Sequence, residues 1–238
     1  MNFKIILTLY LLFLYQSHCD GQYKVNITVH DFSPIPRESI YISGSFNNWD
    51  TLPNPQRKFT KVKSTIHSIT LNLNAGRHEF KLNGGNWSSV EKTGVGSEFE
   101  NRSFTIQSDT SLSINVYQWR DLMIPGNRMA LQQAKEDSTR LKAMTVLAIA
   151  FSGDPIFYNT DSSLYYAQSA MQVINRMNAT GKGKSWNDYN WWINTLRYNY
   201  ATLLRSRGNY LKALEVRLDI LRFQESLNDT MEMISALH

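Results

Sequence analysis

Two tryptophans stand directly after residues that favour turns. Trp49 follows the stretch GSFNN, which ends at Asn48, and Trp87 follows Asn83-Gly-Gly85 and one more asparagine. A large aromatic side chain on a loop is commonly displayed to a ligand, because loops lie at the surface. These indoles therefore suit stacking on a flat apolar ligand face. A second interpretation stays open, in which both indoles pack their loops onto the edge of the fold.

Motifs for catalysis, nucleotide binding and metal binding are weak in this sequence. Gly181-Lys-Gly-Lys-Ser185 ends like a phosphate-binding loop, but Asn178 stands where that loop needs its first glycine. The five histidines are scattered without metal-ligand spacing, and Glu98 and Glu100 flank no recognisable catalytic group. We therefore predict that the protein is not an enzyme and has no catalytic residue, no metal and no cofactor.

The composition favours a folded protein of one or two domains. The 238 residues are 42% hydrophobic and 19% charged, which argues against a disordered or fibrous chain. The formal net charge is +5, and Arg57, Lys58, Lys61 and Lys63 cluster around a strand-like segment. Such a cluster is typical of a solvated strand face, so we predict no nucleic-acid partner.

The first residues have the pattern of a secretion signal. Lys4 precedes an apolar run from Ile5 to Tyr15, which is too short to span a bilayer, and small and polar residues follow it. We predict a signal peptide over residues 1–21, cleaved after Cys19 or Gly21, and an exported protein that is periplasmic or secreted. Lipid attachment at Cys19 is an alternative. Beyond the signal peptide, the sequence predicts no membrane span.

Residues 22–121 alternate apolar and polar side chains with a period of two. Val25, Ile27 and Val29 share one face of the first segment, and later segments repeat the pattern between turn signals. This pattern predicts an immunoglobulin-like antiparallel β-sandwich. The expected strands are Lys24–Val29, Ser39–Ser43, Ser68–Leu73, His78–Leu82, Arg102–Ile106 and Ser111–Val116.

Residues 122–238 have the period of helices, so we predict a multidomain β + α chain. Pro125-Gly-Asn127 is typical of a turn at the boundary. Tight turns between the later helical segments favour antiparallel helix pairs stacked as an α-helical repeat solenoid. The expected helices lie within Arg128–Phe151, after an N-cap at Asp161, and over Tyr189–Arg207 and Tyr210–Leu227.

The β half resembles the starch- and glycogen-binding sandwiches of carbohydrate-binding module families 20 and 48. The resemblance rests on IYISGSFNNWD, LNLNAGRHEFKLNGGNW and NRSF, which follow the family order between Tyr23 and Asp121. It implies that two tryptophans stack on glucose rings while a lysine and an asparagine bond sugar hydroxyls. By position these residues are Trp49, Trp87, Lys81 and Asn101. The stretch Ser88–Glu100 departs from the usual family loop, which leaves the reach of Asn101 open.

The α half resembles tetratricopeptide repeats, in particular those in sensor regions of Bacteroidetes-type signalling proteins. RSRGNYLKALEVRLDILRFQESLND carries a G-x-Y-x-x-A-L start, and TDSSLYYAQSAMQVINRM looks like the second helix of a preceding unit. The resemblance implies a protein partner on the repeats, and TMEMISALH at the end indicates a repeat that is cut short. The residues expected to pack at the helix crossing are Gly208, Tyr210, Ala213 and Leu214.

Together these features predict a non-catalytic exported binding or sensor protein, a fragment of a signalling protein. The sandwich would recognise an α-glucan or another polysaccharide, and the helical repeats would bind a protein. Two alternatives stay open. In one, the chain is a protein–protein interaction module and its sandwich is a spacer without sugar affinity. In the other, the chain is an accessory of a separate carbohydrate-active enzyme.

Overall fold

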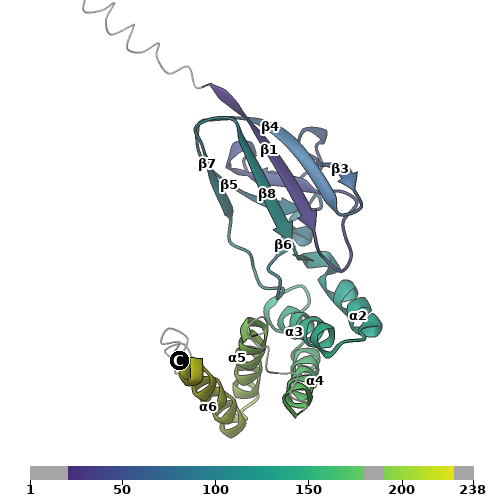
Figure 1. Cartoon of the computed structure of the whole chain (residues 1–238), viewed down its shortest axis with the longest axis vertical. Coiled ribbons are helices and arrows are strands. Elements are labelled where there is room, and N and C mark those ends of the chain that lie inside the picture. Colours follow the sequence, from purple (N-terminus) through teal and green to yellow (C-terminus); the bar gives the residue numbers. More distant parts are fainter. Residues whose placement is uncertain (1–20, 180–189, 228–238) are drawn as a thin grey trace, which may run out of the picture.

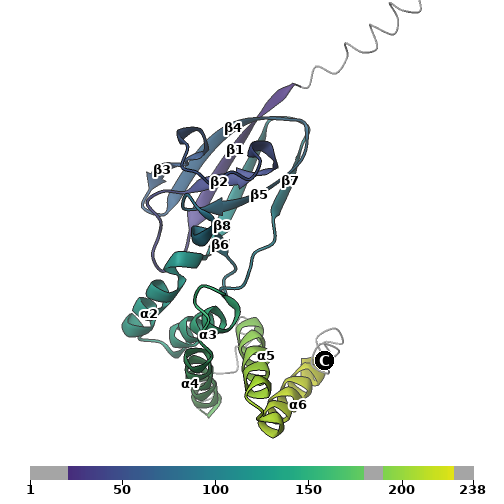
Figure 2. The ribbon, with the colours of Figure 1, turned by 180° about the vertical axis from the view of Figure 1, so that it is seen from behind.

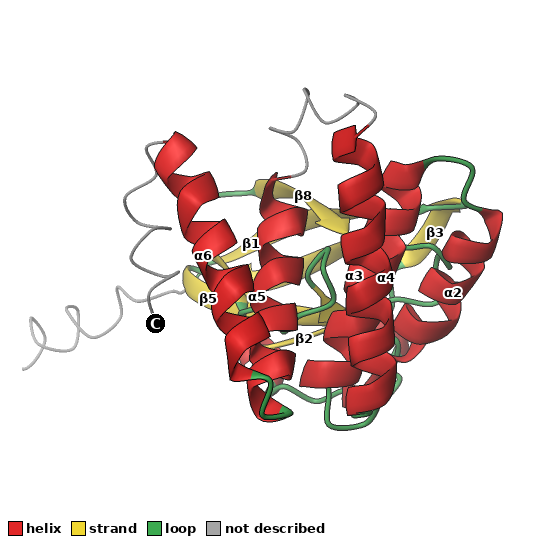
Figure 3. Cartoon of the chain, turned by 90° about the horizontal axis from the view of Figure 1, so that it is seen from below, coloured by secondary structure: helices red, strands yellow, loops and turns green. Residues whose placement is uncertain are grey.

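The computed structural model describes residues 21–179 and 190–227. The predicted signal peptide apart from Gly21, the Gly181–Ser185 turn and the final TMEMISALH segment lie outside the described residues. In the described part, a β-sandwich stands above a group of helices (Figure 1). The view from behind and the view from below show the helices gathered at one end of the strands (Figures 2 and 3). None of the described helices has both the length and the apolar character needed to cross a membrane.

The sandwich has two main sheets. One has the strand order β3-β4-β1-β8, and the other has the order β2-β5-β7. The alternating apolar residues face inward, and Val25, Ile27 and Val29 are fully buried. This confirms the prediction of a β-rich first half followed by helices. The strands are β1 Gln22–Asp31, β2 Tyr41–Gly44, β3 Thr60–Lys63, β4 Ile66–Asn74, β5 Gly76–Asn83, β7 Arg102–Ile106 and β8 Thr110–Val116.

One strand pair corrects the predicted antiparallel arrangement. β1 and β8 pair in parallel, with Ile27 beside Leu112 and Val29 beside Ile114. The other pairs of the two main sheets are antiparallel. Side chains alternate with the same period whichever way a strand runs. The apolar pattern therefore places both strands in the core but carries no information about their direction.

A short third sheet lies at the end of the sandwich nearest the helices (Figure 1). β6 (Glu91–Lys92) and β9 (Gln118–Trp119) pair antiparallel, and all four residues are buried. The apolar pattern predicts neither strand, because three of these residues are polar. The indole of Trp119 is fully buried, and its Nε1 donates a hydrogen bond to the Asp31 carboxylate at 2.9 Å.

The first of the described helices corrects the predicted turn at Pro125-Gly-Asn127. Pro125-Gly-Asn127 lies inside α2, near its start, and not in a turn between domains. Proline is tolerated in the first helical turn, because an N–H there has no partner within the helix. The helix also packs closely at Gly126, where a Cβ would lie 3.2 Å from the Cβ of Pro34. The helices are α2 Met123–Gln133, α3 Asp137–Gly153, α4 Thr160–Ala179, α5 Asn190–Ser206 and α6 Tyr210–Leu227.

Two further helix starts differ from the prediction. The segment Arg128–Phe151, expected to hold one helix, holds the end of α2 and most of α3. Asp161 lies in the first turn of α4, and the cap is Asn159, whose Oδ1 accepts from the Ser162 N–H at 2.8 Å. Asp161 forms an ion pair with Arg207. Asparagine and aspartate are equally good caps, so residue type does not distinguish the two positions.

The later helices share an apolar core, but a tetratricopeptide solenoid is not confirmed. Ala213 is buried in this core, as predicted. Gly208 has a φ of 75° and ends α5, a usual place for glycine. Tyr210 and Leu214, also expected to pack, are exposed on α6, because no other described element covers their side of this last described helix.

A buried ion cluster joins the small sheet to the helices. Arg120 donates from Nε and Nη2 to the two carboxylate oxygens of Asp154 at 2.7 and 2.9 Å, and Lys92 Nζ lies 3.2 Å from the same carboxylate. The side chains of Lys92 and Asp154 are both buried. Burial by itself raises the pKa of Asp154, but hydrogen bonds, first of all from Arg120, outweigh this effect and hold the pKa below its usual value of 3.8.

We expect Asp154→Asn to destabilise the protein by about 3 to 5 kcal/mol near neutral pH, because two cations lose their buried carboxylate. A carboxyl with a lowered pKa stabilises the fold above its unfolded pKa, and this contribution is lost as the pH falls through the folded pKa. The advantage of the wild type should therefore shrink below pH 3.8. Urea unfolding of both proteins at neutral and acid pH measures this difference.

Glu98→Gln is the matched control, because Glu98 pairs with Lys92 at the exposed side of the same cluster. Its cost should stay below about 1 kcal/mol. Equal losses in the two variants would contradict a buried clamp centred on Asp154.

Candidate functional site

The Trp49 loop leaves β2 where two backbones nearly touch. A Cβ on Gly44 would lie 2.3 Å from the carbonyl oxygen of Glu79 on β5, so only glycine fits at this position. Asn47 then closes the turn. Its Oδ1 accepts from the Gly44 N–H at 2.8 Å, and its Nδ2 donates to the Ile42 carbonyl at 3.0 Å. The glycine and the first asparagine of GSFNNWD therefore shape the loop.

The backbone at Trp49 is strained. Asn48 and Trp49 have φ angles of 53° and 58°, a region that bulky side chains rarely adopt. Such a conformation costs about 1–3 kcal/mol and is characteristic of ligand sites. Asp50 holds the loop in place through hydrogen bonds from the Leu52 N–H at 2.9 Å and from Arg57 at 2.7 Å. The same two bonds, in this order, lower the pKa of Asp50, so its carboxylate stays charged at neutral pH.

The Trp87 loop begins at the end of β5. Asn83 Oδ1 accepts from the Gly85 N–H at 2.8 Å, and the φ of Gly85 is 106°, which favours glycine. The Ser89 hydroxyl donates to the Asn86 carbonyl at 2.8 Å and closes the loop. Trp87 lies at the tip and is 42% exposed. The side chain of a buried strand-end asparagine thus fixes a loop that displays an aromatic ring.

The two loops cover the same face of the β2-β5-β7 sheet and bring the indoles together. Ser43 connects the loops, because its hydroxyl donates to the Asp50 carbonyl at 2.8 Å and accepts from Asn83 Nδ2 at 2.9 Å. The ring centroids of Trp49 and Trp87 lie 6.3 Å apart, and the ring planes are tilted by 36°. Trp49 is half-buried and Trp87 is exposed. We call this pair the tryptophan platform.

Lys81 and Asn101 lie farther along the same face. Lys81 pairs with Ser43 in the β2–β5 ladder, so its half-buried side chain points to the side on which the platform lies. Asn101 directly precedes β7, is exposed, and donates from Nδ2 to Glu79 Oε2 at 3.3 Å. Among the described residues, no hydrogen bond joins Lys81 or Asn101 to an indole. Of the four predicted residues, the structure therefore places the two tryptophans side by side, and Lys81 and Asn101 on the same face of the sheet.

The loop motifs do not predict three side chains that support the platform. Tyr41 lies beside Ser43 on the outer side of β2, and its ring is 3.6 Å from the place of a Cβ on Gly85. Ser43 and Asn83 are fully buried although they face away from the sandwich core. The alternation of apolar and polar residues along β2 predicts part of this arrangement. It turns Ile42 inward and Tyr41 and Ser43 outward, but it does not show that loops cover them.

The face offers aromatic surface and hydrogen-bonding groups. Its carboxylates have partners, since Asp50 pairs with Arg57 and Glu79 pairs with Arg77 at 3.1 Å. Within residues 21–179 and 190–227, no group of three histidine, cysteine, aspartate or glutamate side chains could hold a metal ion. Stacking on a ring-shaped ligand and bonding of its polar edge are what this arrangement can provide.

Comparison with known proteins shows a partial similarity. No protein-family model matches the chain. The chain is 36% identical over 104 residues to an amylopullulanase of Thermoanaerobacter thermohydrosulfuricus, and 36% identical over 84 residues to an alpha-amylase of Niallia circulans. These matches cover 42% and 34% of this chain, but the chain spans only 7% and 6% of the two relatives. The similarity is weak and is consistent with a carbohydrate-binding module.

We expect Gly44→Ala to destabilise the protein by about 1–3 kcal/mol and to change the tryptophan emission, because the new Cβ pushes β2 away from β5 beneath the Trp49 loop. Urea unfolding and fluorescence of the native state measure the two effects. Gly153→Ala is the control, since a Cβ at this helical position meets no atom within 4 Å. Its stability should change by less than about 1 kcal/mol. A neutral Gly44→Ala would show that the close approach does not constrain the loop.

Proposed function

We propose that the protein is a non-catalytic binding protein that recognises an α-glucan-type carbohydrate through the tryptophan platform. One observation carries the proposal. Two indoles from loops far apart in the sequence are held 6.3 Å apart, and Trp87 at least is open to solvent. A structural spacer has no need of this arrangement, because exposed indoles contribute little to its core.

The geometry of the platform suits a chain of sugar rings. The C–H faces of a glucose unit are flat and apolar, so they gain from contact with an aromatic ring. Neighbouring rings of an α-linked chain are turned relative to one another, and the ring planes of Trp49 and Trp87 are likewise tilted, by 36°. Lys81 and Asn101, on the same face, are proposed to bond sugar hydroxyls. The names of the two similar proteins, both amylolytic enzymes, also favour a glucan ligand.

We propose that this chain takes no part in bond cleavage itself. Glycoside hydrolysis needs two carboxyl groups that face each other across the scissile bond. Two carboxylates on the same face as the platform, Asp50 and Glu79, are ion-paired with Arg57 and Arg77. Their role in the proposal is to hold loops and strands in place.

The helical half is proposed to bind a protein, and the whole chain is proposed to act outside the cytoplasm as a binding or sensor component. Export rests on the predicted signal peptide. The helical surface rests on α6, where Tyr210, Leu211, Leu214 and Leu218 are exposed. These residues also favour the alternative function, a protein-interaction module in which the sandwich is a spacer.

The first test is a titration of the protein with β-cyclodextrin and maltoheptaose, followed by tryptophan fluorescence. We expect saturable binding that weakens by roughly tenfold or more in Trp49→Ala/Trp87→Ala, because each stacked ring contributes about 1 kcal/mol beyond its buried area. Lys81→Ala should weaken binding by a smaller factor, since it removes one hydrogen-bonding group.

Tyr165→Ala is the matched control for this titration, since it removes an exposed aromatic ring on α4 and should leave affinity unchanged. Circular dichroism shows whether each variant remains folded. If the wild type binds neither saccharide at millimolar concentration, the glucan proposal is wrong and the spacer alternative gains support.

A further inference from the structure

A cavity lies on the other side of the sandwich, where it meets the helices. It has a volume of about 520 Å³ and opens between the ends of β1 and β8 and the helices α2, α3 and α5. Sites for small ligands have volumes of roughly 300–1,000 Å³. Trp49 and Trp87 contribute nothing to its wall. The cavity is therefore separate from the tryptophan platform.

The sandwich contributes exposed stacked rings to this cavity. Phe32 and Tyr117 stack with centroids 5.9 Å apart and planes 22° apart, and His30 stacks on Phe32 at 6.2 Å. Phe32 is 60% exposed and Tyr117 is 47% exposed. The alternation along β1 and β8 sends Val29 and Val116 into the core and these rings out of it. Core packing therefore does not explain why aromatic residues stand here.

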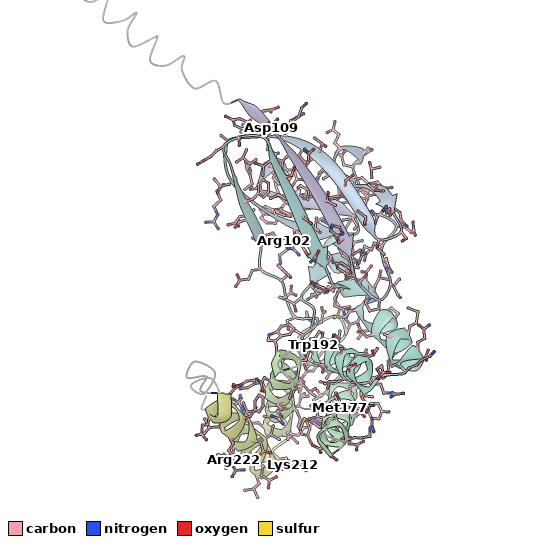
Figure 4. All side chains as sticks on the ribbon, in the orientation of Figure 1. Arg102, Asp109, Met177, Trp192, Lys212 and Arg222 are labelled. Carbon is pink, nitrogen blue, oxygen red and sulfur yellow. The ribbon has the colours of Figure 1, made fainter. Side chains whose placement is uncertain are left out.

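Helix α5 contributes aromatic side chains from the opposite half of the chain. Trp191 and Trp192 meet edge to face, with centroids 5.5 Å apart, and Trp191 is 55% exposed. Trp192 lies at the end of α5 that is nearest the sandwich (Figure 4). The apolar core of the later helices uses Ile193 and Leu196 of α5. The exposed indole of Trp191 contributes little to that core and is available to a ligand.

The polar groups of the cavity are few and mostly uncharged. Thr139, Gln118 and Asn127 line it, and Asn127 Nδ2 donates to Gln118 Oε1 at 2.9 Å. The Gln118 amide can accept a second hydrogen bond at Oε1, and its Nε2 is a donor group. Among the described residues of the wall, Lys142 is the only one with a charge, and its ammonium lies 5.8 Å from the Trp192 ring centroid. No carboxylate lines the described wall.

We propose that this cavity is a second saccharide site, an inference that rests on the proposed function of the sandwich. Aromatic rings from both halves of the chain suit the apolar faces of a sugar, and hydroxyl, amide and ammonium groups suit its hydroxyls. A cationic peptide finds no carboxylate on the described wall, a polyanion finds Lys142 as the one charged group there, and an acyl chain leaves the polar groups unpaired. A saccharide bound here contacts the sandwich and the helices together.

The experiment is a calorimetric titration of the full chain with maltoheptaose. We expect two sites in the wild type and one site each in Trp49→Ala/Trp87→Ala and Tyr117→Ala/Trp191→Ala, with the lost site at least about tenfold weaker. Tyr210→Ala, which removes an exposed ring on α6 outside the cavity, should keep both sites. Trp191→Ala alone, which leaves the sandwich unaltered, should weaken saccharide binding at the cavity.

The outcomes separate the two proposals. A single site in the wild type that is lost in Trp49→Ala/Trp87→Ala and unaffected by Tyr117→Ala/Trp191→Ala overturns the second site and leaves the platform intact. Binding lost only in Tyr117→Ala/Trp191→Ala supports the cavity and overturns the platform. Absence of saccharide binding in every form overturns both proposals. A parallel titration that shows a proline-rich peptide bound at the cavity would then identify a different ligand.

Discussion

The hydroxyl of Ser43 is the contact on which the surface of the sandwich depends. It is buried, donates to the Asp50 carbonyl of one loop and accepts from Asn83 at the start of the other. A buried hydroxyl without partners costs free energy, and here one loop supplies its acceptor and the other its donor. Because the β2–β5 ladder places Ser43 next to Lys81, the position of the loops above the sheet follows from the strand register. The meeting of two distant indoles is thus a consequence of one satisfied polar group.

A second set of buried polar groups joins the sandwich to the helices. Trp119 bonds Asp31 within the sandwich, and the next residue, Arg120, bonds Asp154 at the end of α3. Buried charges are tolerated only where partners surround them, so Lys92 and Asp154 fix each other's position. The predicted domain boundary after residue 121 falls inside a 3₁₀ turn, Arg120–Leu122, directly beside this cluster. The contacts of Arg120 and Lys92 with Asp154 cross this junction, and a turn signal such as Pro125-Gly does not reveal them.

The sequence predicts those parts of the fold that repeat with a period. Six strands and the later helices α5 and α6 follow from apolar spacing, with ends within a few residues of the predicted ones. Apolar spacing does not predict three other features: the parallel direction of β1 and β8, the polar strands β6 and β9, and the cap at Asn159. None of them changes an apolar period. For the site, GSFNNWD predicts a displayed aromatic. It cannot predict that Trp49 meets Trp87, since that contact arises from tertiary folding of two separate loops.

Two kinds of exposed aromatic surface in this chain are held by different means. Trp49 stands on a turn with positive φ angles, and this strain persists because Asn47, Asp50 and Arg57 fix the loop through hydrogen bonds. Phe32, Tyr117 and Trp191 lie on or next to regular strands and a helix, so their positions follow from core residues packed beneath them. A surface held by a strained loop can move when that loop relaxes. A surface held by packed elements moves only when the elements themselves shift, so the rings at the junction are sensitive to how sandwich and helices meet.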